Sequence, residues 1–274
     1  PEMSRGAWIA YLSLGYVPAP TTAFPNIQRL PNASTFSVEN GKASALRRYW
    51  TPPRSEPARS KVAPLSEFDI DLIAETLTES LRRRLLSDVP MAMFLSRGVD
   101  SPLVAAIAAR ELNVMIECLS VAFPGREDML DEAPDAARIA RHLHLEHRTV
   151  AAVDDPSGAG VDALLDLYAE PVDNLGVFPI LQISRAAAGR FKVALTGMAG
   201  DEVTSGYGKH SYLWEKRAFY GLPEWPRLRL GAIGRHLHGL HRWLDAFGNQ
   251  VGIPNPQHYV ALKNGKASEW IRGI

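Results

Sequence analysis

The length, charge balance and cysteine content of the chain exclude several classes of protein. Its 274 residues suffice for one large domain or two modest ones with a sizeable core. Lysine plus arginine (30) equals aspartate plus glutamate (30), so the composition carries no electrostatic signature of nucleic-acid or membrane binding. The single cysteine, Cys118, excludes an intrachain disulfide framework and favours a reducing cytoplasm. No apolar run approaches the ~20 residues of a membrane span.

The first part of the chain predicts small elements joined by turns. Ala7–Gly15 is apolar and periodic, as in a helix. Thr35–Val38 and Ala45–Tyr49 have the pattern of short strands around a turn at Glu39-Asn40-Gly41-Lys42, which is a hairpin signal. The proline-rich, mixed-charge stretch 51–64 predicts a linker.

A long helix and a buried strand follow the linker. Residues 66–86 predict an amphipathic helix, because apolar side chains recur at helical spacing. These side chains are Phe68, Leu72, Ile73, Leu77, Leu81 and Leu85. Met91–Leu95 is an uninterrupted apolar run of strand length, typical of a strand buried on both faces.

The polar stretch 96–101, Ser-Arg-Gly-Val-Asp-Ser, separates this strand from a predicted helix at 103–112. A strand, a short turn and a helix direct backbone N–H groups and a helix N-terminus at an anion. Ser96 and Ser101 add hydroxyl donors. The carboxylate of Asp100 would repel phosphate unless a divalent cation lay between them. A nucleotide phosphate with magnesium satisfies all of these groups.

The middle of the chain alternates strands with helices, which predicts an α/β fold with a parallel sheet and helices on both faces. The predicted strands are Met91–Leu95, Met115–Phe123, His147–Val150 and Lys192–Leu195, and the predicted helices include 134–144, 161–167 and 180–188. Cys118 lies within the second strand, where we expect an inert core residue. Two histidine runs, His142/His144/His147 and His236/His238/His241, lack the mixed ligands of a zinc motif, so we expect surface or capping roles.

A second polar turn follows the last predicted strand. It runs from Thr196 to Tyr207, with glycines that let a turn pass close to a ligand, and with the acidic residues Asp201 and Glu202. Asp100 and Asp201 would then hold magnesium from opposite walls of a cleft. Two ordinary acidic turn residues are the alternative.

These residues together resemble a known family. Ser96-Arg97-Gly98-Val99-Asp100-Ser101 resembles the Ser-Gly-Gly-x-Asp-Ser pyrophosphate loop of ATP pyrophosphatases, and Ser87-Asp88-Val89-Pro90 narrows this to the asparagine synthetase family. The turn at 196–207 resembles that family's Ser-Gly-[Asp/Glu]-Gly-x-Asp-Glu…Gly-Gly-Tyr loop. The resemblance covers about Ala7 to Tyr220 and concerns the C-terminal synthetase domain of the glutamine-hydrolysing type.

The resemblance implies a domain organisation and roles for individual residues. Residues 1–62 would be the tail of an N-terminal glutaminase-like domain with a linker, and 63–274 an ATP-binding domain of the adenine nucleotide alpha-hydrolase type, incomplete at its C-terminus. A start at Pro1 without methionine also indicates a fragment or a processed chain. Adenosine would be bordered by Leu95, Val121, Thr196 and Gly197, and pyrophosphate held by Ser96, Gly98, Val99 and Ser101. Magnesium would be bound by Asp100 and Asp201, and the candidates for substrate contact are Glu170, Asp173 and Glu202.

Three departures from the family pattern leave two functions open. Arg97 replaces the first loop glycine, and its guanidinium either swings out to add a phosphate donor or fills the pocket. Met198 stands where the family has an acidic residue, and no segment resembles the family's later Asp-Arg-x-Ser-Met-Ala stretch or its catalytic lysine region.

The leading hypothesis is a cytoplasmic, ATP- and Mg²⁺-dependent amide-forming ligase. It would adenylate a small-molecule or peptide carboxylate and receive nitrogen from a glutaminase domain or a separate donor. The rival is a degenerate synthetase domain that serves as a binding or structural module. The acceptor acid, the nitrogen source and the oligomeric state, a homodimer included, stay open.

Overall fold

The chain forms two compact units. The computed structural model describes residues 2–52, 64–124, 131–152, 159–171, 173–174, 176–208, 210–211, 223, 225–226, 229–230 and 233. One unit comprises Pro1–Ser55, Leu165–Asn174 and Tyr207–Ile274, and the other comprises Glu56–Leu164 and Leu175–Gly206. The predicted domain boundary at residues 62 and 63 stays a prediction.

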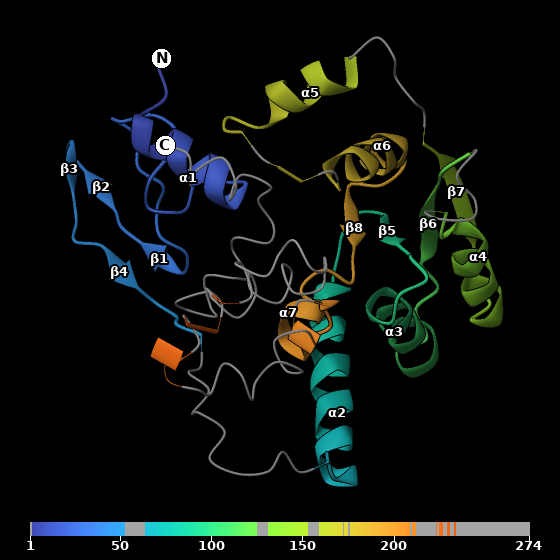
Figure 1. The fold of residues 1–274 in the computed structure, drawn as a ribbon. Helices are drawn as coiled ribbons and strands as arrows, with labels where there is room; N and C mark the ends of the chain where they lie inside the picture. Colours follow the sequence, from blue (N-terminus) through green and yellow to red (C-terminus); the bar gives the residue numbers. More distant parts are fainter. Residues whose placement is uncertain are drawn as a thin grey trace. The chain divides into compact units, whose positions relative to one another are not determined.

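The second unit is built on a parallel sheet of four strands (Figure 1). The strands are β5 (Met91–Phe94), β6 (Glu117–Ala122), β7 (His147–Ala151) and β8 (Val193–Leu195), in the order β7-β6-β5-β8. Met93 pairs with Cys118 on one side and with Leu195 on the other, and all three ladders are parallel. The predicted parallel sheet is therefore confirmed. Because β5 and β8 are neighbouring parallel strands, the loops that follow them lie side by side at the carboxyl ends of the strands.

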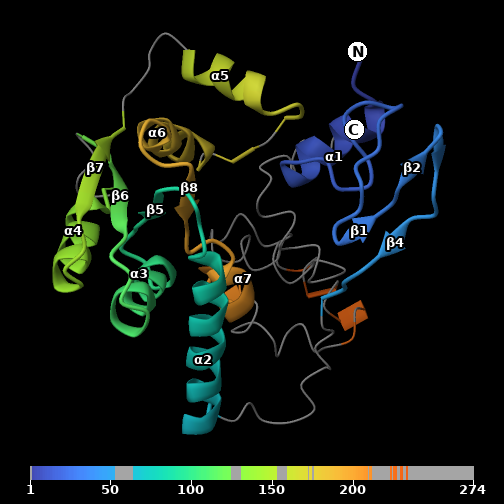
Figure 2. The same ribbon diagram turned by 180° about the vertical axis from the view of Figure 1, so that it is seen from behind.

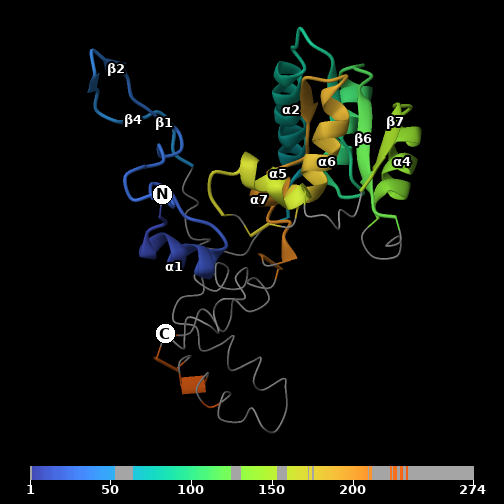
Figure 3. The same cartoon turned by 90° about the horizontal axis from the view of Figure 1, so that it is seen from above.

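Helices cover both faces of this sheet, as predicted. On one face, α3 (Asp100–Ala106) and α4 (Ala133–His142) pack on a core that contains Met93 and Cys118. On the other face, α6 (Val177–Ala188) packs through Ile183 and Ala187. Figure 3 shows α4 and α6 on opposite sides of β6.

The helix after β5 begins earlier than predicted and changes type. It starts at Asp100, and from Ile107 to Glu111 it becomes a π-helix, η1, in which the N–H of Leu112 donates to the carbonyl of Ile107. The long helix α2 (Glu67–Arg84) packs through Leu81 on this segment (Figure 2). At its start, Ser66 and Asp69 form a reciprocal capping box, and the hydrogen bonds from Ser66 lower the pKa of Asp69.

The first unit contains the predicted helix and hairpin. Helix α1 (Arg5–Leu14) is capped by Ser4 and ends at Gly15, whose φ is 79°. Asn40 (φ 51°) and Gly41 (φ 76°) form the hairpin turn, since both adopt the left-handed conformation that this turn type requires. The antiparallel pairs are β2 (Val38–Glu39) with β3 (Lys42–Ala43), and β1 (Ser34–Thr35) with β4 (Arg47–Arg48).

Two further helices belong to the described part of the chain. Helix α5 covers Ala159–Leu167, and α7 covers Gly200–Thr204. Most of the predicted linker and the histidines 236, 238 and 241 lie outside the described residues. Among the described residues, no helix has the length and apolarity to cross a membrane, and no three His, Cys, Asp or Glu side chains gather as a metal site.

Candidate functional site

The loop between β5 and α3 is organised by the hydroxyl groups of two serines. The N–H of Ser96 donates to Oγ of Ser101 (2.9 Å), and the two hydroxyl oxygens lie 2.9 Å apart. The N–H of Gly98 donates to Oγ of Ser96 at 3.3 Å. Ser101 is buried, whereas Val99 is 78% exposed. The two serine hydroxyls therefore accept hydrogen bonds from the backbone of the loop on its inner side, and Val99 lies on its exposed side.

The start of α3 has the form of an anion site. The first N–H groups of a helix have no acceptor within it, and Val99 at the N-cap supplies no side-chain acceptor. Because α3 continues into η1, the aligned peptide dipoles of both segments favour negative charge at this end. A loop followed by a helix start is an arrangement at which phosphates are commonly bound in proteins.

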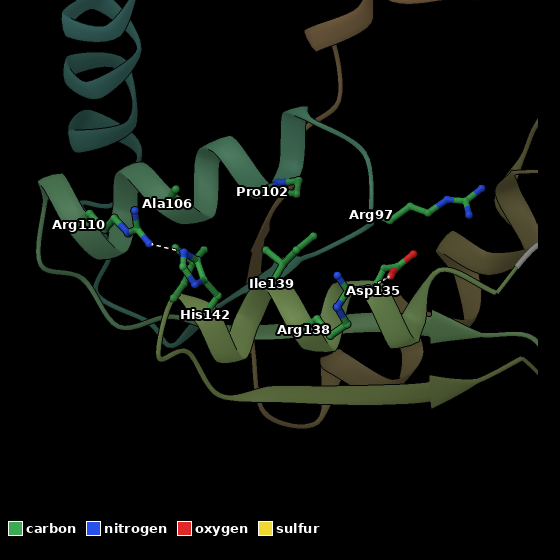
Figure 4. Close-up of a pocket in the computed structure, with 9 residues that line it drawn as sticks. Arg97, Pro102, Ala106, Arg110, Asp135, Arg138, Ile139 and His142 are labelled. Carbon is green, nitrogen blue, oxygen red and sulfur yellow. Dashed lines mark hydrogen bonds and ion pairs between the residues drawn. The ribbon is translucent and has the colours of Figure 1, made fainter.

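Arg97 is directed outward from this loop. Its Nε lies 3.3 Å from Oε1 of Glu132, and its backbone N–H donates to Oε2 of the same carboxylate (3.3 Å). The side chain is 54% exposed, and Figure 4 shows it extending away from Pro102. The φ angle of Arg97 is not positive, so a residue with a Cβ fits this position without backbone strain.

The outward side of the loop opens on a groove between α3–η1 and α4 (Figure 4). The groove measures ≈ 680 Å³ and has Arg97 at one end. At the other end, Nη2 of Arg110 lies 2.7 Å from Nε2 of His142, which must therefore accept the hydrogen bond. This groove runs between helices, whereas the two predicted loops lie at the strand ends.

The second loop, residues 196–206, lies directly against the start of α3. A Cβ added at Gly197 would stand 2.5 Å from the backbone N of Ser101, and one added at Gly200 would overlap the Asp100 carboxylate. At Gly197 the two nearest atoms belong to the main chain, so no side-chain atom fits there, whereas a Cβ at Gly200 would require the Asp100 carboxylate to move. Ala199 adopts a left-handed φ of 75°, at the place where the family motif has a glycine.

One of the two predicted metal ligands, Asp100, has its carboxylate in this contact. The Asp100 carboxylate touches Gly200, the residue that precedes Asp201, and the Asp201 carboxylate touches Gly206. Mg²⁺ is commonly bound by one or two carboxylates, with phosphate oxygens and water as the other ligands. Two partly buried carboxylates beside an anion site fit that donor set.

The four candidates for contact with adenosine occupy different environments. Leu95 is 4% exposed and packs in the core with Met93, so only its backbone can reach a ligand. Val121 packs on the α6 face. Oγ1 of Thr196 accepts from the N–H of Met198 (3.3 Å), and Gly197 covers the start of α3.

The candidates for substrate contact fall into both units. Glu202 is exposed on α7, in the second unit. Glu170 and Asp173 lie in the first unit, where Glu170 pairs with Arg29 (2.6 Å) and accepts from the N–H of Ala23 (2.9 Å). Asp173 packs against Gly15 and donates its N–H to the carbonyl of that glycine (2.9 Å). Both residues therefore have structural contacts, and their role in substrate binding stays a prediction.

Sequence reasoning missed three residues around the first loop. Glu132 forms an ion pair with Arg97, and nothing in the sequence around Glu132 indicated this contact. Ser120 and His147 form a partly buried hydrogen bond next to Leu95, and no sequence pattern indicated this contact. Cys118 is fully buried, and burial, with a smaller contribution from the charge of Glu117, raises the pKa of its thiol to about 11. It is therefore protonated at neutral pH and unsuited to act as a nucleophile.

The parallel sheet with helices on both faces defines the class of protein as an α/β domain, in which two touching loops lie at neighbouring strand ends. The particular family follows from comparison of the sequence, because the asparagine synthase family matches residues 72–264. The chain belongs to this family, which confirms the resemblance.

Curated relatives carry related descriptions. A putative asparagine synthetase (glutamine-hydrolyzing) 2 of Methanocaldococcus jannaschii is 25% identical over 268 residues, which cover 95% of this chain and 50% of that protein. A probable asparagine synthetase (glutamine-hydrolyzing) of Schizosaccharomyces pombe is 30% identical over 169 residues, 53% of this chain and 29% of that protein. The chain thus spans half the length of the first relative and less of the second.

One solved structure covers most of the chain. The NH3-dependent NAD synthetase of Campylobacter jejuni has a TM-score of 0.35 and 16% identity, and the match covers 74% of this chain and 96% of that one. A score below 0.5 supports no functional comparison.

Proposed function

We propose that this chain is the ATP-binding part of an ATP-dependent amide-forming ligase of the asparagine synthetase type. The observation that supports it most is the contact between the two loops, in which Gly200 lies against the Asp100 carboxylate. The contact brings the loop at 96–101 and the start of α3 against the loop at 196–206, and Asp100 and Asp201 are the carboxylates that we propose for the cation. That set matches what pyrophosphate release requires, since charge accumulates on the departing group.

The proposed reaction has two steps. A carboxylate oxygen attacks the α-phosphorus of ATP, the bond to the β-phosphate breaks, and pyrophosphate leaves. Ammonia or an amine then attacks the acyl carbon, loses a proton and displaces AMP. Bound Mg²⁺ would neutralise phosphate charge. The residues of this chain would orient the phosphates through the loop at 96–101 and hold the cation through Asp100 and Asp201.

The rest of the proposal concerns ligands and location. The carboxylate substrate is a small molecule or a peptide, and nitrogen comes from a glutaminase domain or a separate donor. We place the protein in the cytoplasm, and a homodimer is compatible with the proposal.

The test is exchange of labelled pyrophosphate into ATP. The protein is incubated with ATP, Mg²⁺, labelled pyrophosphate and either aspartate or another candidate acid. We expect label to enter ATP only when the correct carboxylate is present, because exchange requires reversible adenylation. If no acid supports exchange and calorimetry detects no nucleotide binding, the ligase proposal is wrong.

The rival function, a synthetase-like module without catalysis, is favoured by one observation. Met198 replaces the acidic residue of the family motif and is 74% exposed, so the loop offers no carboxylate at that position. Nucleotide binding without pyrophosphate exchange would support this module.

The outward position of Arg97 predicts that Arg97→Gly changes the dissociation constant of ATP less than about threefold. The pair with Glu132 is half exposed, and such pairs contribute about 0–1 kcal/mol to stability. Calorimetric titration of ATP into Arg97→Gly measures the effect, and Arg97→Ala controls for the added flexibility of glycine. A tenfold loss of affinity in both variants would identify Arg97 as a phosphate ligand, and a tenfold gain would show that it blocks the site.

A further inference from the structure

A series of hydrogen bonds joins β7 and β6 to Leu95, the residue that follows β5. Nε2 of His147 on β7 lies 2.9 Å from Oγ of Ser120 on β6. Oγ of Ser120 in turn donates to the carbonyl oxygen of Leu95 at 2.6 Å. Leu95 is the residue immediately before the loop, and both it and Ser120 are at most 4% exposed. The series of hydrogen bonds therefore ends at the residue where the loop begins.

The chemistry of the hydroxyl fixes the direction of these hydrogen bonds. A carbonyl oxygen only accepts hydrogen bonds, so Ser120 must give its single hydrogen to Leu95. Its oxygen then accepts, and His147 must donate from Nε2. Burial lowers the pKa of His147, so its ring is neutral at pH 7 with the hydrogen on Nε2.

The peptide group between Leu95 and Ser96 is held from both sides. Its carbonyl accepts from Ser120, and its N–H, which belongs to Ser96, donates to Oγ of Ser101 (2.9 Å). From Ser101 the contacts continue to Oγ of Ser96 and to the N–H of Gly98. A rotation of this one peptide would therefore disturb the hydrogen bonds of the Ser96 and Gly98 N–H groups.

We propose that Ser120 and His147 are positioning residues that orient the nucleotide loop through the Leu95–Ser96 peptide. The expected effect on ATP binding rests on the proposed function. The expected effect on the conformation of the loop is independent of the proposed function. Neither residue touches the phosphates. They act through the peptide, with His147 orienting the Ser120 hydroxyl and Ser120 orienting the carbonyl of Leu95.

The experiment compares Ser120→Ala with three other variants and uses two readouts. Hydrogen exchange of peptides that cover residues 95–101 reports on the loop without nucleotide, and calorimetric titration with Mg–ATP reports on binding. Ser120→Ala leaves a buried carbonyl without its donor, so we expect exchange at Ser96 and Gly98 to speed up and ATP to bind about tenfold more weakly. His147→Phe keeps the Ser120 hydroxyl and should weaken binding about threefold.

Rescue and a matched control separate positioning from loss of stability. Ser120→Thr keeps a hydroxyl and should restore both loop protection and ATP affinity to within about threefold of the wild type. Ile183→Val removes one methyl group from the core on the other face of the sheet, so it should lower the melting temperature and leave both loop readouts unchanged.

The outcomes are distinguishable from failure of the proposed function. If loop exchange in Ser120→Ala matches that in Ile183→Val, the positioning role is overturned. If loop exchange responds to Ser120→Ala but wild-type protein binds no ATP, the positioning role stands and the proposed function fails. If Ser120→Ala does not fold, the comparison of His147→Phe with the wild type decides by the same two readouts, and an unchanged loop again overturns the role.

Discussion

Replacing Gly197 with alanine is expected to separate the two loops and to abolish tight ATP binding. The new Cβ would stand 2.5 Å from the backbone N of Ser101 and 2.9 Å from the backbone carbon of Asp100. Both neighbours are main-chain atoms, so the clash is relieved only by moving α3 or the loop itself. Such overpacking costs about 1–3 kcal/mol of folding free energy. A displacement of about 1 Å at a site of this kind can also cost about a hundredfold in activity.

Gly189→Ala is the matched control for Gly197→Ala. A Cβ at Gly189, at the C-terminal end of α6, meets no atom within 4 Å. Neither glycine has a positive φ, so the two substitutions differ in space and not in backbone strain. We expect thermal unfolding and calorimetric ATP titration to show a large loss for Gly197→Ala and almost none for Gly189→Ala. Equal behaviour of the two variants would contradict the close approach of the loops.

The sheet could be predicted because each of its strands carries a local signal. Met91–Phe94 is apolar throughout, and the segments at β6, β7 and β8 alternate with helical patterns, so strand type and parallel pairing follow from periodicity and connection length. The hairpin is equally local, since Asn40 and Gly41 are the residues that accept its positive φ angles.

Features that depend on contacts distant in the sequence could not be predicted. The π-helical turn at Ile107–Glu111 has the same residue pattern as an α-helix. The ion pair of Glu170 with Arg29 could not be predicted, because the two residues are 141 positions apart and nothing local indicates the contact. Ser120 appeared as a polar residue in an otherwise apolar strand, and only its distances to Leu95 and His147 give it a role.

The candidate site was predicted in its residue types and not in its contacts. The family motif placed Asp100 and Asp201 on two loops, and the order β5-β8 explains why those loops meet. The glycine that the motif has at position 199 accounts for the left-handed φ of Ala199. The motif did not indicate that Arg97 would pair with Glu132, because that contact joins residues 35 positions apart.

Asp100→Asn is expected to reduce pyrophosphate exchange at least about a hundredfold, because loss of one charge-stabilising group at a transition state has that effect. The change keeps the shape of the side chain, and among the described residues no ion pair involves Asp100, so the fold should persist. Asp201→Asn should behave alike. Asp88→Asn, at an exposed position near the opposite end of β5, is the matched control and should leave exchange unchanged.

A double-mutant cycle tests whether Asp100 acts through the loop contact. A Cβ at Gly200 would overlap the Asp100 carboxylate, so Gly200→Ala should also impair exchange by displacing that group. If both substitutions disable the same carboxylate, the loss in the double variant should be far smaller than the product of the single losses. Multiplicative losses would mean that Gly200 and Asp100 act independently, and full activity of Asp100→Asn would remove the carboxylate from the proposed mechanism.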